Sequence, residues 1–390
     1  MKKIIKKLFL FSLLIYFLQS LNAWFTWHIP ISLIITLNAL VSIIFYFQNK
    51  KTIKFSFPIQ ISILAYVIAI SYIASFWSFG QFVVYLVSTI PISIVIASDS
   101  DFKIKLLNFL TKWMALILLP SLILFILLLF GINLPDAGEI THPTSSFYYY
   151  TNYVFVLKGV YGIRFNSIFC EPGHLGMILS FMLFANNFNL KNKYVLILFI
   201  SVFFTLSLAG IILTFVGFII RNVFKQQFKK GLIYLISLGL IIYTIVIFSS
   251  QYNNGDNYVN KLIIERLEYD NQSGTIAGDN RVDFFTERAF NSILFFEFMF
   301  GKAFSQEYAG SGFKIYILKF GFISAFLFAL FYYSLTKTSN NKLMALGLFF
   351  LYCLAFVQRS YPFWASQLLI FICAMQNFRL YDKYHIKKKK

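Results

Sequence analysis

The stretch Tyr194-Val-Leu-Ile-Leu-Phe-Ile-Ser-Val-Phe-Phe-Thr-Leu-Ser-Leu-Ala-Gly-Ile-Ile-Leu-Thr-Phe-Val-Gly-Phe-Ile-Ile220 contains no charged residue. An apolar helix needs about 20 residues to cross roughly 30 Å of hydrocarbon, so this run is too long for one ordinary crossing. Whether it crosses a membrane once or twice determines on which side of the membrane each of the following segments lies.

The basic residues on either side of this run favour two crossings. A single helix would separate Lys191 and Lys193 from the four basic residues between 221 and 230, whereas positive residues gather on the cytoplasmic side of a membrane. Ser207 and Gly210, in the middle of the run, are small enough for a tight reversal. The sequence therefore predicts two short helices.

The whole chain has the composition of an integral membrane protein, with 59% hydrophobic and 13% charged residues. Strict alternation of apolar and polar residues is absent, which favours helices over barrel strands. We predict an all-α polytopic fold of about twelve transmembrane helices, with residues 1–390 forming one membrane domain. Besides the run above, the predicted spans are residues 8–21, 30–47, 57–76, 79–97, 113–132, 173–188, 232–249, 313–335, 343–357 and 362–378.

The distribution of charge agrees with this predicted membrane topology. With both termini in the cytoplasm, the predicted inside segments hold 24 of the 34 basic residues and 3 of the 15 acidic residues. The positive charge thus indicates contact with membrane lipid headgroups and no nucleic-acid partner. An alternative for the first segment is a cleaved signal peptide, because four lysines precede an apolar run that ends near Ala23.

Two segments, residues 133–172 and 251–312, are too long and too polar to be simple connections, and both are predicted on the outer side. In the first of them, residues 145–160 are rich in aromatic and β-branched residues, which indicates a short hairpin or a segment in the membrane interface. These aromatic side chains form either an interfacial belt or a platform for sugar rings.

The second long segment contains a predicted helix that starts near Asp279 or Asn280 and runs through Phe300. Arg281 and Arg288 are seven residues apart and share one face of that helix. Two guanidinium groups on one face can bind a diphosphate through paired hydrogen bonds. The alternative is a solvated helix whose arginines are surface charge.

The first long segment ends in Arg164-Phe-Asn-Ser-Ile-Phe-Cys-Glu-Pro-Gly-His-Leu-Gly176, where polar groups meet the start of an apolar helix. Pro172 suits the first helical position, so Glu171 and His174 flank the helix start. Glu171 is either a capping acid or a functional carboxylate, and His174 is either a structural or a functional histidine. Arg164 can hold Glu171 ionised or bind an anion.

These residues, in this order, resemble the O-antigen and capsular polysaccharide polymerase family, which is related to the O-antigen ligase superfamily. The resemblance rests on Arg164–Gly176, Thr205–Gly210, Asn280-Arg281, the turn at Phe300-Gly301 and a following span that contains Gly321. It covers roughly residues 161–335. In the earlier helices it extends only to their apolar character.

The resemblance implies a glycosyltransferase of the bacterial plasma membrane that makes cell-envelope polysaccharide: O-antigen, capsule or exopolysaccharide. Such an enzyme joins oligosaccharide repeat units linked to undecaprenyl diphosphate on the outer side of the membrane. The implied catalytic residues are Glu171, Arg164 and Arg281, and Arg288 and His174 are implied substrate-binding residues. A separate flippase and a chain-length regulator are the implied protein partners.

The expected reaction needs a base for the attacking hydroxyl and positive charge for the departing diphosphate. Glu171 can be the base, and Arg164 and Arg281 can neutralise the leaving group. We therefore expect a metal-independent enzyme without a cofactor.

Two alternatives are an O-antigen ligase and a flippase or other transporter of lipid-linked oligosaccharide. Ligases usually carry a His-Asn pair after the second large loop, but residues 301–321 contain no histidine. Transporters usually bury ionisable groups near the bilayer centre and have related halves, neither of which is evident here. Asp99-Ser100-Asp101 fits a metal-binding signature of nucleotide-sugar transferases, but it lies in a short predicted cytoplasmic turn. The three cysteines show no paired spacing.

Overall fold

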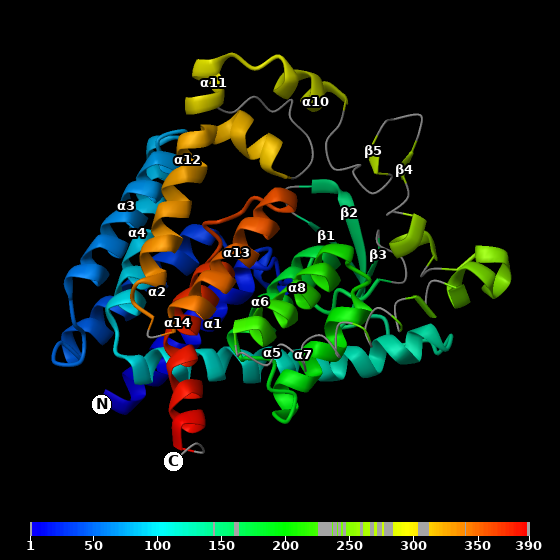
Figure 1. Ribbon diagram of the computed structural model, residues 1–390, viewed down its shortest axis with the longest axis horizontal. Helices are drawn as coiled ribbons and strands as arrows, with labels where there is room; N and C mark the ends of the chain where they lie inside the picture. The colour runs from blue at the N-terminus through cyan, green and yellow to red at the C-terminus, as the bar shows by residue number, and fades with distance from the viewer. Residues whose placement is uncertain are drawn as a thin grey trace.

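The computed structural model is dominated by α-helices (Figure 1). It describes residues 2–142, 145–159, 164–224, 236, 240, 243–244, 247–257, 260–265, 269–270, 275–276, 284–302, 312–339 and 341–387. The helices are α1 (Lys2–Ser20), α2 (Ile31–Gln48), α3 (Phe57–Ala74), α4 (Phe79–Ala97), α5 (Ser100–Leu129), α6 (Pro172–Ala185), α7 (Lys193–Phe204), α8 (Leu208–Phe224), α10 (Phe284–Asn291), α11 (Phe295–Phe300), α12 (Phe313–Thr336), α13 (Lys342–Gln358) and α14 (Ala365–Lys387).

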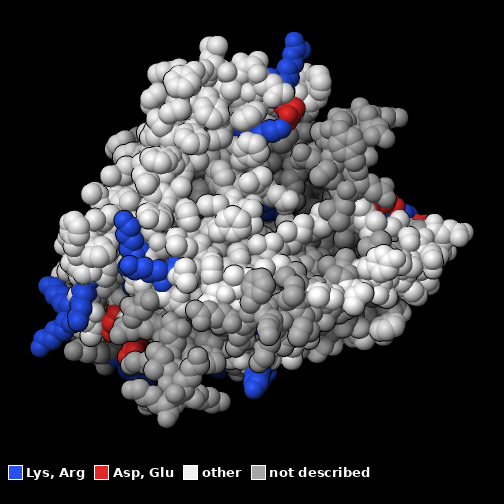
Figure 2. All heavy atoms as spheres, in the orientation of Figure 1, with Lys and Arg blue, Asp and Glu red and all other residues white. Residues whose placement is uncertain are grey.

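The helices have the surface of a membrane protein. Among the described residues, five helices, α2, α3, α4, α5 and α12, are long and apolar enough to cross a membrane. Large apolar side chains face outward from the bundle, for example Phe57 at 74% and Phe79 at 81% exposed. On the face drawn in Figure 2, charged side chains are sparse and grouped in a few places. A surface this apolar indicates that the helices are embedded in lipid.

The predicted break in the long apolar run is confirmed. Helix α7 ends at Phe204 and α8 begins at Leu208, with Leu206 in the turn at a φ of 45°. A Cβ added to Gly210 would lie 2.9 Å from the backbone of Gly176, so the two glycines let α8 and α6 approach closely.

Two predicted helix boundaries are wrong. Helix α5 begins at Ser100, well before the predicted start at 113, because the Asp99 carboxylate accepts the Phe102 N–H at 2.7 Å and caps the helix. The aromatic helix expected to run through Phe300 is two short helices, α10 and α11, since the chain turns between Asn291 and Phe295. The predicted span 232–249 lies largely outside the described residues.

Helix α6 is the centre of the fold, and all of its residues from Pro172 to Ala185 are buried. It packs against α7, α8, α13 and α14. Its 14 residues extend about 21 Å, which is less than the roughly 30 Å of a hydrocarbon core.

Segments at and near the ends of the helices contact one another in two separate groups. One group, which we name the Glu171 end, is tied by backbone and side-chain hydrogen bonds between connections far apart in the sequence. These are Trp24 N–H to Ile168 O at 3.0 Å, Phe165 N–H to Phe204 O at 3.1 Å, Tyr72 hydroxyl to Phe300 O at 3.1 Å and Ser360 hydroxyl to Gly312 O at 2.8 Å.

The second group, which we name the Asp99 end, is held in the same way. Its hydrogen bonds are Lys54 N–H to Ala97 O at 3.0 Å, Ser100 hydroxyl to Gln376 at 2.8 Å, Ser339 hydroxyl to Met375 O at 2.8 Å and Asn377 amide to Ala185 O at 2.8 Å. In these contacts, connections predicted on the outer side meet at the Glu171 end, and segments predicted on the cytoplasmic side meet at the Asp99 end.

Helix α1 is an integral part of the bundle. Its side chains Phe9, Leu13 and Phe17 are completely buried, and its last residue, Ser20, accepts the Ser366 N–H of α14 at 2.9 Å. Helix α1 therefore packs as one of the helices of the bundle.

The first long segment forms an antiparallel sheet, so the predicted hairpin is confirmed. Strand β2 (Ser145–Asn152) pairs with both β1 (Glu139–His142) and β3 (Leu157–Gly159). Ring contacts from Trp27, beside the short helix η1 (Trp24–Thr26), reach the sheet at Tyr150, 5.6 Å between centroids. The side chains of residues 145–149, where sugar stacking was one expectation, lie outside the described residues.

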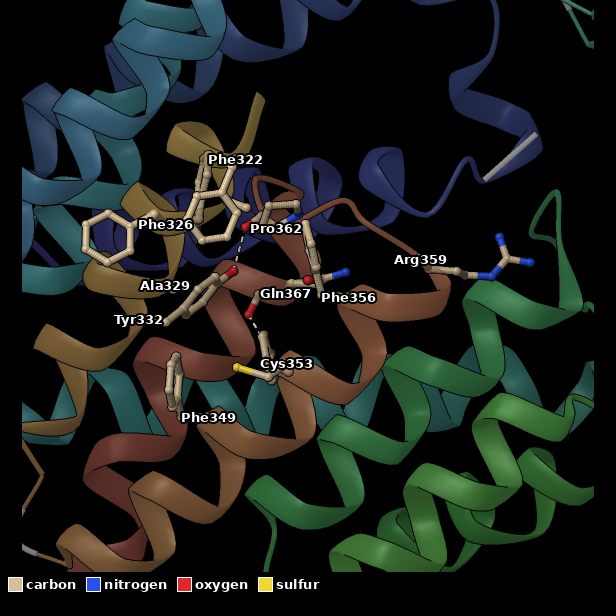
Figure 3. Close-up of a pocket in the computed structure, with 13 residues that line it drawn as sticks. Phe322, Phe326, Ala329, Tyr332, Phe349, Cys353, Phe356, Arg359, Pro362 and Gln367 are labelled. Carbon is tan, nitrogen blue, oxygen red and sulfur yellow. Dashed lines mark hydrogen bonds between the residues drawn. The ribbon is translucent and has the colours of Figure 1, made fainter. Parts of the chain in front are cut away.

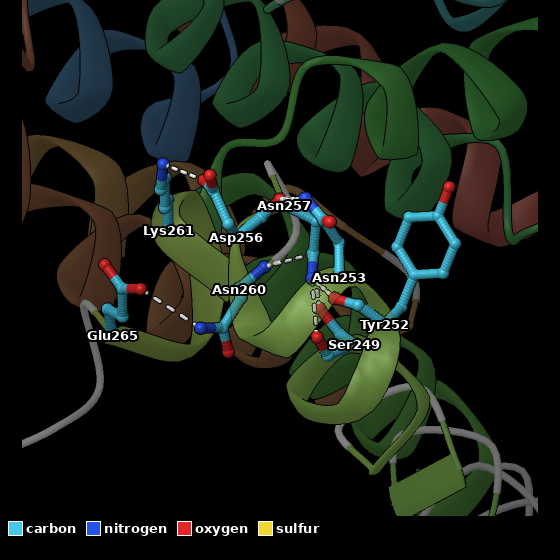
Figure 4. Close-up of polar contacts among 8 residues, drawn as sticks. All are labelled: Ser249, Tyr252, Asn253, Asp256, Asn257, Asn260, Lys261 and Glu265. Atoms are coloured by element: carbon cyan, nitrogen blue, oxygen red, sulfur yellow. Dashed lines mark hydrogen bonds and ion pairs between the residues drawn. The ribbon is translucent and has the colours of Figure 1, made fainter.

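A polar cluster shapes the start of the second long segment (Figure 4). Asn257 exchanges hydrogen bonds with Ser249, at 2.6 Å to its amide oxygen and 2.5 Å from its amide nitrogen. Lys261 pairs with Asp256, and Asn260 donates to Glu265 at 3.0 Å. These contacts hold the described residues of the cluster together. The segment also contains the two-residue strands β4 (Tyr269–Asp270) and β5 (Thr275–Ile276).

The second long segment is joined to the bundle at a break in α12. Gly321 has a φ of 74° within that helix, and Gly301, just after α11, has a φ of 83°. A Cβ on either glycine would overlap the backbone of the other's segment, and Lys302 N–H donates to Leu318 O at 2.9 Å. The turn after α11 is thus inserted into the break of α12, and only glycine fits both backbones without strain.

We expect Gly321→Ala or Gly301→Ala to lower the free energy of unfolding by about 2 kcal/mol or more, because each adds backbone strain and a backbone overlap. The measurement is thermal unfolding of the purified protein in detergent. The matched control is Gly80→Ala, since a Cβ at Gly80 meets open space. Equal melting temperatures for all three variants would contradict this view of the α11–α12 junction.

Candidate functional site

The candidate site is built on the amino terminus of α6. Glu171 occupies the N-cap position, with an extended backbone (φ −129°), and Pro172 follows as the first helical residue. The Glu171 side chain makes no capping hydrogen bond to α6. Its carboxylate Oε2 instead lies 2.5 Å from Nη1 of Arg359 and 3.6 Å from Nε2 of His174. The interpretation of Glu171 as a simple capping acid is therefore wrong.

Arg359 comes from the short connection between α13 and α14. The side chains of Arg359 and Glu171 are 13% and 20% exposed, so the ion pair is mostly removed from solvent. The guanidinium lies over Gly173, where a Cβ would overlap it. Glycine at the second position of α6 thus makes room for the arginine beside the helix amino terminus.

His174 is buried, with an exposed fraction of 5%. Its ring contacts Trp364 edge-on at 4.5 Å between centroids and Tyr361 at 5.6 Å. Tyr361 and Trp364 stack on each other at 4.3 Å. The connection from α13 to α14 therefore supplies both the cation for Glu171 and an aromatic wall for His174.

Arg164 also lies near the start of α6, at the turn between α7 and α8. Its Nε donates to the carbonyl of Thr205, in the turn between α7 and α8, at 3.2 Å. The Thr205 hydroxyl would in turn lie 3.0 Å from a Cβ at Gly176. Two of the sequence segments that carried the family resemblance, 164–176 and 205–210, are thus in direct contact.

The remaining predicted site residues are not part of this cluster as described. Arg281 lies outside the described residues, as do Asp279 and Asn280. Arg288 is exposed on α10. That helix is attached to α12 by an ion pair between Glu287 and Lys314, 2.5 Å between Oε1 and Nζ.

The sheet of the first long segment is anchored directly beside Glu171. The Tyr150 hydroxyl donates to the carbonyl of Cys170 at 2.7 Å, and Tyr150 is completely buried. Burial raises the pKa of the Cys170 thiol to about 11. The Cys170 side chain is buried beside Glu171, and its carbonyl anchors the sheet.

An apolar groove runs along α12, α13 and α14 and ends at Arg359 (Figure 3). Its volume is about 240 Å³. The lining residues are mainly aromatic or small, and include Phe322, Phe326, Phe349, Phe356 and Tyr332. In Figure 3 the Arg359 side chain extends away from these residues toward the green ribbon of α6. Arg359 thus belongs to both the groove and the carboxylate site.

Sequence reasoning missed Arg359, Tyr361 and Trp364. The available signal was an arginine in a four-residue connection on the predicted outer side, followed by Tyr-Pro-Phe-Trp. Its partner Glu171 is 188 residues away along the chain. In the described part of the chain, no three His, Cys, Asp or Glu side chains gather in a way that could hold a metal ion.

Comparisons of this chain with protein-family models, with curated proteins and with solved structures find no match. The geometry of the site is therefore the basis for the functional argument.

We expect Arg359→Gln to destabilise the protein by about 3 kcal/mol, because it leaves a carboxylate in a mostly buried site without its counter-charge. The double variant Glu171→Gln/Arg359→Gln should recover much of that loss, since two neutral amides can hydrogen-bond to each other. Thermal unfolding of both variants in detergent measures the difference.

The matched control is Arg288→Gln, at an exposed position, which should change stability by less than about 0.5 kcal/mol. Additive effects of the two site substitutions would show that the pair contributes no coupling energy.

Proposed function

We propose that this protein is a membrane glycosyltransferase that polymerises lipid-diphosphate-linked oligosaccharide units, similar to the O-antigen and capsular polysaccharide polymerases. The observation that carries the proposal is that Arg359 joins an apolar groove to a partly buried carboxylate at a helix amino terminus. A substrate with a long apolar tail, a diphosphate and a sugar needs these three environments side by side.

The apolar groove suits the isoprenoid tail of the carrier. Its walls are aromatic and small side chains of α12 and α13, such as Phe322, Ala325 and Phe349. Lipid-facing aromatic residues continue from it on α12, where Phe326 is 51% exposed. A tail in this groove would have access from the bilayer, and its diphosphate would lie near the guanidinium of Arg359.

Positive charge and helix geometry support diphosphate binding at the Glu171 end. Arg359 lies over the amino terminus of α6, where the helix dipole also favours an anion. Arg164 is held at the neighbouring α7–α8 turn. Guanidinium groups bind two phosphate oxygens at once, so these arginines, with Arg281 from the second long segment, can neutralise charge on a leaving diphosphate.

The Glu171–Arg359 pair suggests how substrate binding activates the base. A carboxylate held 2.5 Å from a guanidinium is a weak base, because the cation favours its ionised form. When a diphosphate binds Arg359 in place of Glu171, the carboxylate loses the adjacent positive charge and becomes more basic. Its carboxylate then accepts the proton of an acceptor hydroxyl as the new oxygen–anomeric carbon bond forms. The bond from the anomeric carbon to the diphosphate oxygen breaks, and undecaprenyl diphosphate leaves.

The proposed topology has twelve spans, both termini in the cytoplasm and the two long segments on the outer face of a bacterial plasma membrane. The contacts at the Glu171 and Asp99 ends are consistent with this alternation. The asymmetry of basic residues supports the assignment of the Asp99 end to the cytoplasm.

We expect a membrane-impermeant maleimide to label His28→Cys and Asp136→Cys in intact cells, and to label Lys51→Cys and Lys191→Cys only after permeabilisation. All four positions are exposed, so labelling depends on the side of the membrane. The background is a variant in which Cys170, Cys353 and Cys373 are replaced by alanine. Labelling of Lys51→Cys before permeabilisation would reverse the proposed orientation.

We expect a strain that lacks this protein to accumulate single lipid-linked units outside the membrane and to make no long polysaccharide. Polymerisation should fall by about 100-fold or more in Glu171→Ala, Arg164→Ala, Arg281→Ala and Arg359→Ala, because each removes a base or a charge that stabilises the leaving group. Gel separation of the polysaccharide with a carbohydrate stain measures chain length.

The matched control is Lys337→Ala, which removes a cation at the Asp99 end. In the deletion strain this variant should restore polysaccharide of full length. The membrane level of every variant is measured in parallel. Accumulation of units inside the cell would identify a flippase. Long chains that are made but not transferred to their final acceptor would identify a ligase.

A further inference from the structure

The structure contains a larger cavity that the proposed chemistry has not used. It has a volume of about 680 Å³ and is formed by α1, α2, α3, α4 and the start of α14. This volume is within the range of roughly 300–1,000 Å³ that is typical of small-ligand pockets. The cavity lies at the Glu171 end, since its wall includes the α3–α4 connection at Trp77 and Ser78 and the α1–α2 connection at Asn22.

The lining of this cavity combines apolar, aromatic and uncharged polar side chains. Among the described residues that form it, none is Lys, Arg, Asp, Glu or His. The polar groups are amides and hydroxyls, and the flat polar groups are indole and phenol rings. These residues are Gln19, Gln81, Asn22, Ser20, Ser32, Ser78, Ser88, Tyr16, Tyr85, Trp77 and Trp364, and the apolar residues beside them are Ile31, Ile35, Ile70, Val84, Phe363 and Ala365.

This chemistry selects a neutral carbohydrate. Amides and hydroxyls both donate and accept hydrogen bonds, as sugar hydroxyls require, and aromatic faces pack on the apolar C–H faces of sugar rings. Trp77 and Tyr85 lie together on one wall, 6.2 Å between ring centroids. A diphosphate would find no cation here, and an isoprenoid tail would leave the amides without partners.

Two residues connect the cavity to the Glu171 site. Trp364 forms part of the cavity wall, and its ring contacts His174 at 4.5 Å. Asn22 also lines the cavity, and its carbonyl accepts the Cys170 N–H, next to Glu171, at 3.2 Å. A ligand in the cavity would therefore lie against Trp364, whose ring also contacts His174 beside Glu171.

We propose that this cavity binds the neutral sugar residues of the oligosaccharide unit, as a subsite separate from the diphosphate site at Arg359. The identity of the sugar rests on the proposed polymerase function, but binding of a neutral oligosaccharide to the cavity can be measured without it. The inference assigns a role to helices α1–α4, which the family resemblance left undefined.

The test is binding to the purified full-length protein in lipid nanodiscs, measured by isothermal titration calorimetry with two probes. One probe is the oligosaccharide repeat unit released by mild acid from the host's own polysaccharide, which has no lipid or phosphate. The other probe is farnesyl diphosphate, which has a tail and a diphosphate but no sugar.

Two variants alter the cavity. Gln81→Ala removes an exposed amide from the wall, and Gly80→Trp fills the mouth, where a Cβ meets open space. Their controls are Gln60→Ala, an exposed glutamine at the other end of the α3–α4 pair, and Phe79→Trp, the outward-facing neighbour of Gly80.

Oligosaccharide binding should weaken about tenfold in Gln81→Ala and more in Gly80→Trp, with no change in either control. Farnesyl diphosphate binding should be unchanged in these variants and weakened in Arg359→Ala. Equal oligosaccharide affinity in wild type and both cavity variants, or no affinity in wild type, would overturn the inference. Loss of farnesyl diphosphate binding in the cavity variants would show that the cavity binds the lipid diphosphate instead.

If the polysaccharide of the deletion strain keeps its full length, the polymerase function fails while the binding result still stands. Conversely, a cavity that binds no sugar leaves the effects of Glu171 and Arg359 on polymer length untouched.

Discussion

The structure depends on placing a carboxylate at the start of a completely buried helix. Every residue of helix α6 is buried, so its amino terminus lies among packed side chains with little access to water. An ionised group in such a place requires a partner, because desolvation of a lone charge costs several kcal/mol. Arg359 provides that partner, and its guanidinium fits against α6 only because residue 173 is glycine. The pair thereby fixes the α13–α14 connection onto the centre of the fold.

Other elements at this end are arranged around the same helix start. The turn between α7 and α8 contacts Gly176 and holds Arg164, and the sheet of the first long segment is anchored at Cys170 through Tyr150. Short helices that meet inside a bundle leave polar backbone groups at membrane depth, which is tolerated where protein surrounds them. The same arrangement places charged side chains where lipid is excluded and electrostatic interactions are strong.

The two cavities at this end of the molecule have linings of different chemistry. The groove along α12 and α13 is apolar, whereas the cavity between α1, α4 and α14 is uncharged and contains several hydrogen-bonding groups. Arg359 borders the first, and Trp364, five residues later, borders the second. The short connection between α13 and α14 therefore contributes to both linings and also supplies the partner of Glu171.

The sequence by itself determined that the protein is helical and membrane-embedded, and it determined most of the helices. Apolar runs long enough to cross a bilayer predicted the helices, and small residues near Ser207 predicted the break between α7 and α8. Local polarity also marked Glu171, His174 and Arg164 as unusual residues at a helix start. It misplaced the start of α5 because the capping by Asp99 outweighs the polarity of the residues that follow. Only the tertiary structure decided which groups meet: Arg359 with Glu171, Gly301 with Gly321, and Trp364 with His174. The two members of each pair are not neighbours in the sequence, and a pairing of that kind is selected by the packing of helices against one another, which no local pattern of residues encodes.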